Sequence, residues 1–123
     1  MADVYGKIFT KEEAEKQFGK VTYSVDMKTE EVKKIIESSP VGIMFKFVDE
    51  KLNILNKQRK NVYGSIEPES SEVYNHYSTG VFEELLVKGK QDLTTFQMRG
   101  ETFTVQNGEF VLEEGIPCPP LCH

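Results

Sequence analysis

Residues 96–112 read FQMRGETFTVQNGEFVL, and this stretch decides the fold. Asn107-Gly108 favours a two-residue type I′ turn, because both residues tolerate positive φ. A similar turn is expected at Arg99-Gly100. Residues 93–114 are therefore predicted to form a three-stranded antiparallel meander.

The two turns set the expected register of this meander. One turn pairs Val105 with Phe110 and Phe103 with Leu112, and the other pairs Phe96 with Phe103. Because side chains alternate between the faces of a strand, both turns predict the same buried face. That face contains Phe96, Phe103, Val105, Phe110 and Leu112, and the opposite polar face contains Gln97, Thr102, Thr104, Gln106 and Glu109.

Local signals predict the elements near the start of the chain. Thr10 and Glu13 can form a capping box and Gly19 suits a helix end, which predicts a helix over residues 11–18. Hydrophobic periodicity predicts the short elements that follow. They are a strand at residues 21–25, a helix at residues 30–38 and a hairpin at residues 41–55.

A longer amphipathic pattern precedes the meander. Apolar residues recur at three- and four-residue spacing, which predicts a long helix over residues 71–88, with Gly80 as a point of bending. The stripe comprises Val73, Tyr74, Tyr77, Val81, Phe82, Leu85 and Leu86. We expect an α+β fold in which one antiparallel sheet is packed on one face by this long helix and the two shorter helices.

The chain length suits a single domain. Its 123 residues predict one α+β domain over residues 1–114, followed by a Pro- and Cys-rich tail at residues 115–123. The sequence shows no internal repeat beyond similar helix starts at residues 10–13 and 29–31.

Charge and hydropathy limit the classes of partner. The net charge is −5, and residues 1–60 hold 12 Lys and Arg against 10 Asp and Glu, while residues 61–123 hold 3 against 10. Nucleic-acid binding is not expected, because it needs a broad cationic surface. No apolar stretch suits a membrane span and no signal peptide opens the chain, so we expect a cytoplasmic protein without a membrane partner.

One basic cluster is a candidate binding site. Lys57, Arg59 and Lys60 lie close together in a polar stretch, where they could hold an anion or an acidic partner. A short basic cluster between apolar segments is more often a solvated loop.

A second candidate site contains Tyr74, His76 and Tyr77, within the densest run of hydrogen-bonding side chains. Imidazole titrates near neutral pH, so a general base is conceivable here. His76 lies off the apolar stripe, and an exposed helix histidine is the simpler interpretation. No nucleophile elbow, His-Glu-x-x-His pair or phosphate-binding glycine loop accompanies it, so we predict no catalytic residue and no cofactor.

The tail contains Cys118, Cys122 and His123, and three interpretations stay open. A metal site would use all three side chains, although structural zinc usually has four ligands. A disulfide between Cys118 and Cys122 requires their Cα atoms within about 7 Å. The third interpretation is a polyproline-like tail with two unpaired thiols.

Residues 39–43, with Asp49, Glu50 and Asn56 after them, resemble the opening of a PAS-type sensor domain. The resemblance covers residues 37–114 in the order hairpin, helix and three strands. It implies a fold-level analogy to a sensor domain and identifies no residue that anchors a cofactor.

These features favour a noncatalytic binding or protein-interaction module, because aromatic residues are abundant and no catalytic motif is present. Its partner would be a protein or a small molecule. One alternative is a small-ligand or sensor domain with a pocket between the sheet and the long helix. Another is a redox or metal role for the tail.

Overall fold

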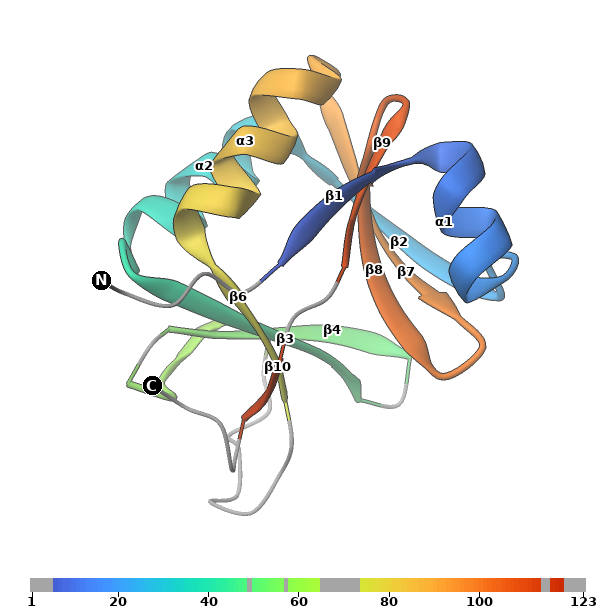
Figure 1. The fold of residues 1–123 in the computed structure, drawn as a ribbon. Helices are drawn as coiled ribbons and strands as arrows, with labels where there is room; N and C mark the ends of the chain where they lie inside the picture. Colours follow the sequence, from blue (N-terminus) through green and yellow to red (C-terminus); the bar gives the residue numbers. More distant parts are fainter. Residues whose placement is uncertain (1–5, 49, 57, 65–73, 114–115, 119–123) are drawn as a thin grey trace.

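The computed structural model describes residues 6–48, 50–56, 58–64, 74–113 and, as backbone, 116–118. This part of the chain forms two five-stranded antiparallel sheets and three helices (Figure 1). The first sheet contains, in spatial order, β1 (Lys7–Thr10), β9 (Phe110–Glu113), β8 (Thr102–Asn107), β7 (Leu93–Arg99) and β2 (Tyr23–Lys28). The second contains β10 (Ile116–Cys118), β6 (Tyr74–Ser78), β3 (Gly42–Val48), β4 (Lys51–Asn56) and β5 (Asn61–Tyr63). The helices are α1 (Lys11–Phe18), α2 (Thr29–Glu37) and α3 (Thr79–Gly89).

The predicted α+β class is confirmed, but the prediction of a single sheet is wrong. The hairpin β3–β4 lies in the second sheet, whereas the meander β7–β8–β9 lies in the first. The reason is non-local pairing, since β7 pairs with β2 and β3 pairs with β6. The resemblance to a PAS-type domain therefore does not extend to the way the hairpin and the meander are joined.

Local signals located the early elements well. The helix at residues 11–18 is confirmed, and both hydrogen bonds of its capping box form: Thr10 N–H donates to Glu13 Oε1 at 2.9 Å, and Glu13 N–H donates to Thr10 Oγ1 at 3.2 Å. The strand predicted at residues 21–25 begins two residues later, as β2. The helix predicted at residues 30–38 is α2.

The buried face of the meander is as predicted, although its register is shifted. Phe96 lies opposite Val105, and Val105 lies opposite Leu112. Gly100 and Gly108 each have a φ of 62° and are the first central residues of their turns, so each turn starts one residue later than predicted. The resulting shift of two residues in pairing preserves the alternation of side chains. Phe96, Phe103, Val105 and Leu112 are therefore buried, and Phe110 is half-buried.

The helix predicted over residues 71–88 is wrong over residues 74–78, and residues 71–73 lie outside the described residues. Tyr74–Ser78 form strand β6, and α3 begins only at Thr79. In β6 the side chains of Tyr74 and Tyr77 belong to different clusters, on opposite sides of the sheet. Pairing of β6 with β3 therefore prevails over the helical spacing of the apolar residues.

Although the sequence shows no repeat, the topology does. The first unit, β2–α2–β3–β4–β5, and the second unit, β6–α3–β7–β8–β9, contain the same order of elements. Each unit gives its first strand to one sheet and its other three strands to the other sheet. The registers also agree, since Val25 of β2 pairs with Phe96 of β7 as Asn75 of β6 pairs with Phe45 of β3.

The two units contact each other through the first residue of α2 and the first residue of α3, which are both threonines. Thr29 of α2 donates its N–H and its hydroxyl to carbonyl groups of residues 91–92, in the loop after α3. Thr79 of α3 donates the same two groups to carbonyls of residues 39–41, in the loop after α2. The equivalent contacts show that the repeat extends to individual hydrogen bonds.

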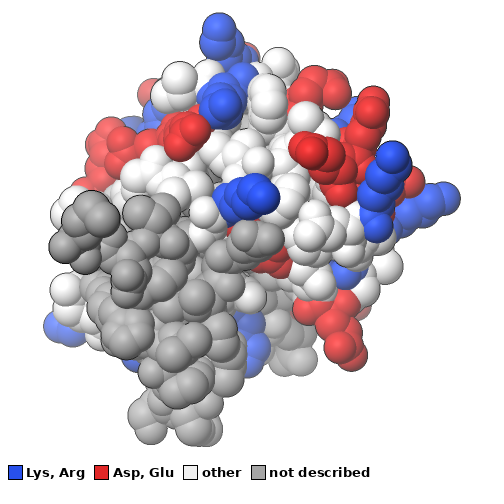
Figure 2. Space-filling model, viewed as in Figure 1, with Lys and Arg blue, Asp and Glu red and all other residues white. Residues whose placement is uncertain are grey.

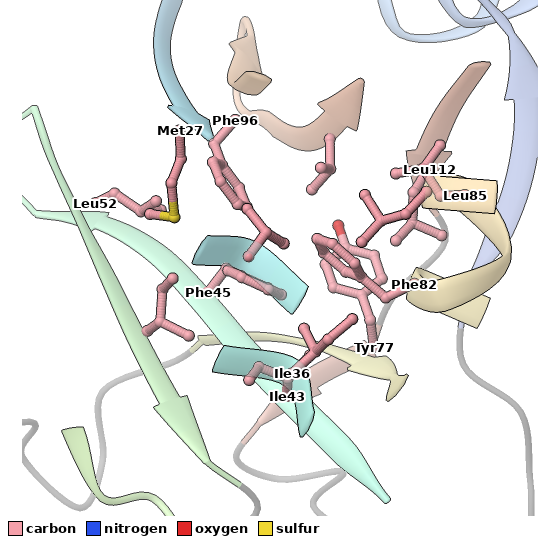
Figure 3. Close-up of a cluster of buried hydrophobic side chains, with 14 of the residues drawn as sticks. Met27, Ile36, Ile43, Phe45, Leu52, Tyr77, Phe82, Leu85, Phe96 and Leu112 are labelled. Carbon is pink, nitrogen blue, oxygen red and sulfur yellow. The ribbon is translucent and has the colours of Figure 1, made fainter. Parts of the chain in front are cut away.

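The main core lies between the two sheets and beneath α2 and α3 (Figures 1 and 3). Both units contribute to it, with Met27 of β2 packed beside Leu52 of β4 and Phe82 of α3 beside Phe45 of β3. Helix α1 covers the other face of the first sheet, where Ala14 packs in a separate cluster.

Candidate functional site

The centre of the core, where a ligand pocket was one alternative, is filled by aromatic side chains. The ring centroid of Phe45 lies 5.3 Å from that of Phe82 and 5.4 Å from that of Phe96 (Figure 3). It lies 5.7 Å from the ring centroid of Phe103. All four side chains are at most 2% exposed. This packing leaves no room for a small molecule at the aromatic centre.

Tyr77, one of the predicted site residues, points into this core from β6. Its hydroxyl lies 2.9 Å from Glu113 Oε1 and 3.2 Å from the carbonyl oxygen of Phe103, and it can donate to either. Burial raises the pKa of Tyr77 well above its usual value, and the negative charge of Glu113 adds to the shift. Tyr77 thus remains a neutral group that joins the two sheets.

His76 is not the exposed helix histidine that was predicted. It lies in β6, is 1% exposed, and belongs to the face of the second sheet opposite Tyr77. Its ring packs directly on Gly42 of β3: a Cβ atom placed at Gly42 would lie 2.2 Å from His76 Nε2. The side chain is part of the packing of this sheet.

Arg59 and Tyr74, two of the predicted binding residues, lie close together in the structure. The guanidinium carbon of Arg59 lies 5.7 Å from the centroid of the Tyr74 ring, and Lys46 Nζ lies 5.8 Å from it. Tyr74 is fully buried, and Asn53 donates a hydrogen bond to its hydroxyl at 2.8 Å. Lys60 is exposed. Lys57 lies outside the described residues.

The tail is only partly described. The backbone of Cys118 lies in β10, opposite Tyr74, so part of the predicted tail belongs to the second sheet. Cys122 and His123 lie outside the described residues, and the metal, disulfide and thiol interpretations stay predictions.

The polar face of the meander is largely a buried network. Gln97 and Thr104 are at most 4% exposed, and Thr104 donates its hydroxyl hydrogen to Gln97 Oε1 at 2.9 Å. Arg99 is equally buried and donates to Gly19 O at 2.8 Å, next to the end of α1. Burial lowers the pKa of Arg99, and the nearby Glu15 opposes that shift. These groups stabilise the sheet because they satisfy one another.

The clearest exposed feature is the edge of the first sheet formed by β2. Among the described residues, β2 pairs with β7 only. Thr29, which directly follows β2, donates its N–H to the carbonyl oxygen of Asp92, the residue just before β7. Backbone groups alternate along an antiparallel ladder, so odd-numbered residues of β2 direct theirs to β7. Ser24, Asp26 and Lys28 therefore direct theirs away from the sheet, and their side chains are exposed.

A groove of about 430 Å³ runs beside this edge, between the two sheets. Val25 of β2 lines one side, and Leu52 of β4 and Tyr63 of β5 line the other. Tyr63 is 39% exposed, so the groove presents an aromatic ring to solvent. We call the edge of β2 together with this groove the open seam.

The equivalent edge in the second unit is covered by the chain itself. Strand β10 pairs antiparallel with β6, with Ile116 opposite His76 and Cys118 opposite Tyr74. Pro117 lies between them, where the backbone points away from β6 and no N–H is needed. We call this covered edge the closed seam.

The registers of the two units make the comparison residue by residue. Val25 and Asn75 occupy equivalent positions, so Ser24 corresponds to Tyr74 and Asp26 to His76. The backbones of Tyr74 and His76 pair with β10 and their side chains are buried, whereas the side chains of Ser24 and Asp26 are exposed. The open seam thus corresponds to the edge that β10 covers in the second unit.

Little in the sequence indicates the open seam. Its strand was predicted, but its place at an edge depends on the distant pairing with β7. The available signal was Asp26 and Lys28, two charged residues on one face of a short strand, a pattern typical of sheet edges.

A second groove, of about 480 Å³, lies at the start of α2. Lys28, Lys33 and Lys90 line it together with Glu30 and Asp92, so two carboxylates accompany its three ammonium groups. Charges of both signs are also interspersed over the face shown in Figure 2. This groove consequently has little preference for one charge.

The described part of the chain holds no group of three His, Cys, Asp or Glu side chains suited to a metal ion. None of its helices is long and apolar enough to cross a membrane. Comparisons with family models, curated proteins and solved structures gave no match.

Proposed function

We propose that this chain is a noncatalytic protein-interaction module that binds an extended segment of a partner protein along β2. The observation that carries the proposal is the difference between the two seams. In the second unit a short antiparallel strand covers the edge of β6. At the equivalent edge of β2, the described residues provide no such strand.

The chemistry of the edge suits an added strand. Ser24 and Asp26 each direct one N–H and one C=O away from the sheet, and Lys28 directs its N–H. The C=O of Lys28, the N-cap of α2, accepts the first hydrogen bond of that helix, while an extended peptide can pair with the other groups. Such main-chain hydrogen bonds give affinity with little dependence on sequence. The groove beside them can then take apolar side chains from the partner, against Leu52 and Tyr63.

A proline substitution tests the proposal without disturbing β7. The N–H of Ser24 faces away from the sheet, so Ser24→Pro removes a donor for the partner while the pairing with β7 is kept. Ser24→Ala is the matched control, because it changes the same side chain and retains the N–H.

Linear peptides would be selected from a displayed library against the purified full chain and titrated into labelled protein. We expect saturable amide shifts at Ser24, Asp26 and Lys28, retained in Ser24→Ala and lost in Ser24→Pro. Thermal unfolding of both variants checks that the fold is intact. Peptides that bind Ser24→Pro as well as the unmodified protein would contradict the proposal.

A further inference from the structure

We infer that the partner segment runs antiparallel to β2 and carries a cation opposite Asp26, an acid opposite Lys28 and apolar residues between and after them. This inference rests on the proposed function and adds the orientation and chemistry of the partner. It is carried by three observations, which concern the closed seam, the groove and the exposed charges.

The closed seam indicates the orientation. Residues 116–118 run antiparallel to β6, and their register places Ile116 opposite His76. Asp26 has the position of His76 in the first unit. A segment bound in the same way therefore meets Lys28 first, then Asp26 and then Ser24, as it runs from its N-terminus to its C-terminus.

The groove determines which partner positions are apolar. Val25 and Met27 direct their side chains to the inner face of β2. Met27 is 5% exposed, and Val25 lines the groove. Partner residues opposite these two positions project to the same side. Their side chains would lie in the groove against Leu52 and Tyr63, so they are expected to be apolar.

The exposed charges determine the other positions. Asp26 and Lys28 project from the outer face of β2, and Thr95 donates a hydrogen bond to Asp26 Oδ1 at 2.7 Å, which holds the carboxylate in place. Opposite charges directly across two strands stabilise the pair, and like charges destabilise it. Lys or Arg is therefore expected opposite Asp26, and Asp or Glu opposite Lys28.

A second copy of this chain fits the edge less well. An antiparallel pair of β2 strands centred on Asp26 places that carboxylate opposite its own equivalent. A pair centred on Val25 places Asp26 opposite Ser24, without a counter-charge. A pair centred on Met27 matches Asp26 with Lys28 but extends over three residues only, because α2 begins at Thr29. The charges thus favour a different protein as partner.

Two blocked peptides that differ only in charge order test the inference. One has the core Glu-Val-Lys-Val-Thr, and the other has the core Lys-Val-Glu-Val-Thr, both with the same Gly-Ser flanks. Binding is followed through the amide signals of Ser24, Asp26 and Lys28 in the full chain. We expect the first peptide to bind about fivefold or more tightly than the second at low salt, and this preference to shrink as salt is added.

The double variant Asp26→Lys, Lys28→Glu provides the decisive control, because it should reverse the preference between the peptides. Equal binding of both peptides to the unmodified protein overturns the inferred charge pattern but leaves strand addition standing. If neither peptide shifts the three amides, strand addition itself fails and the inference fails with it. Sedimentation is expected to show a monomer, and a dimer that loses its self-association in Ser24→Pro would identify a second copy as the occupant and overturn the inference.

Discussion

The first and second units share their connectivity and strand register, yet their leading strands have opposite surroundings. In the second unit, Tyr74 and His76 of β6 are buried beside β10. In the first unit, Ser24 and Asp26 occupy the equivalent positions of β2 and are exposed. Two equivalent strands of a repeat can therefore differ in exposure, because within the described residues one has neighbours on both sides and the other has a neighbour on one side.

The largest expected effect compares packing at the two seams. Phe103 of β8 and Leu52 of β4 are equivalent by register, and they are 2% and 5% exposed. Phe103→Ala is expected to cost about 3–5 kcal/mol of unfolding free energy, and Leu52→Ala, beside the open groove, about 2 kcal/mol. Urea unfolding measures both, with the exposed Val87→Ala as control. Equal costs would show that the two seams are packed alike.

The next effect concerns the reciprocal threonines. Thr29 Oγ1 donates to Gln91 O at 2.7 Å and accepts from Asn107 Nδ2 at 3.2 Å, whereas Thr79 Oγ1 donates to Ser39 O. Removing either hydroxyl takes away hydrogen bonds in a buried environment, so Thr29→Val and Thr79→Val are each expected to cost about 1–3 kcal/mol. Thr29→Val should lie at the lower end of this range, because Asn107 Nδ2 can still donate to Thr94 Oγ1 at 3.0 Å and to Gln91 O at 3.3 Å. Serine at either position should restore most of the loss.

A pH effect distinguishes Tyr77 from Met27, its equivalent in the first unit. Burial keeps Tyr77 neutral in the folded protein, whereas an unfolded tyrosine ionises near pH 10. The stabilisation is therefore fully present below about pH 10. Above it, the unfolding free energy should fall by up to about 1.4 kcal/mol per pH unit. Chemical unfolding between about pH 9 and pH 11 measures the slope, because this range brackets the pKa of tyrosine in the unfolded chain.

Tyr77→Phe serves as the comparison for this slope, because it removes the titrating group and keeps the ring. A variant that loses stability with pH as steeply as the unmodified protein would show that other groups cause the alkaline effect.

The smallest effect concerns Gly80, in the first turn of α3, where the first unit has Glu30. A Cβ atom at Gly80 would have no other atom within 4 Å. Gly80→Ala should therefore raise the unfolding free energy by about 0.5–1 kcal/mol, because alanine loses less backbone entropy in a helix. A lower thermal midpoint in this variant would show that α3 requires glycine there.

The sequence predicted those parts of the fold that local chemistry controls. Thr10 and Glu13 located α1, because a capping box needs only four consecutive residues. The meander kept its buried face despite the wrong pairing, because a shift of two residues returns Phe96 and Phe103 to the same side.

What the sequence could not predict depends on contacts between distant segments. The spacing of Tyr74 and Tyr77 suits a helix, and only the pairing with β3 makes the segment a strand. Of the predicted site residues, the structure joined Arg59 with Tyr74 and buried His76. The open seam was missed because Asp26 and Lys28 give only a weak local signal of an edge, and the position of β2 in the sheet depends on its pairing with the distant strand β7.

The exchange of strands between units also governs the order in which the protein can fold during synthesis. Val25 pairs with Phe96, and Phe45 pairs with Asn75, so neither unit can complete a sheet from its own residues. When the first unit leaves the ribosome, β2 lacks β7 and must wait until most of the chain has been made. Long waits of this kind slow folding, because distant contacts must form before they stabilise anything. During that interval both edges of β2 are unpaired, so the nascent chain presents strand edges with which other chains can pair.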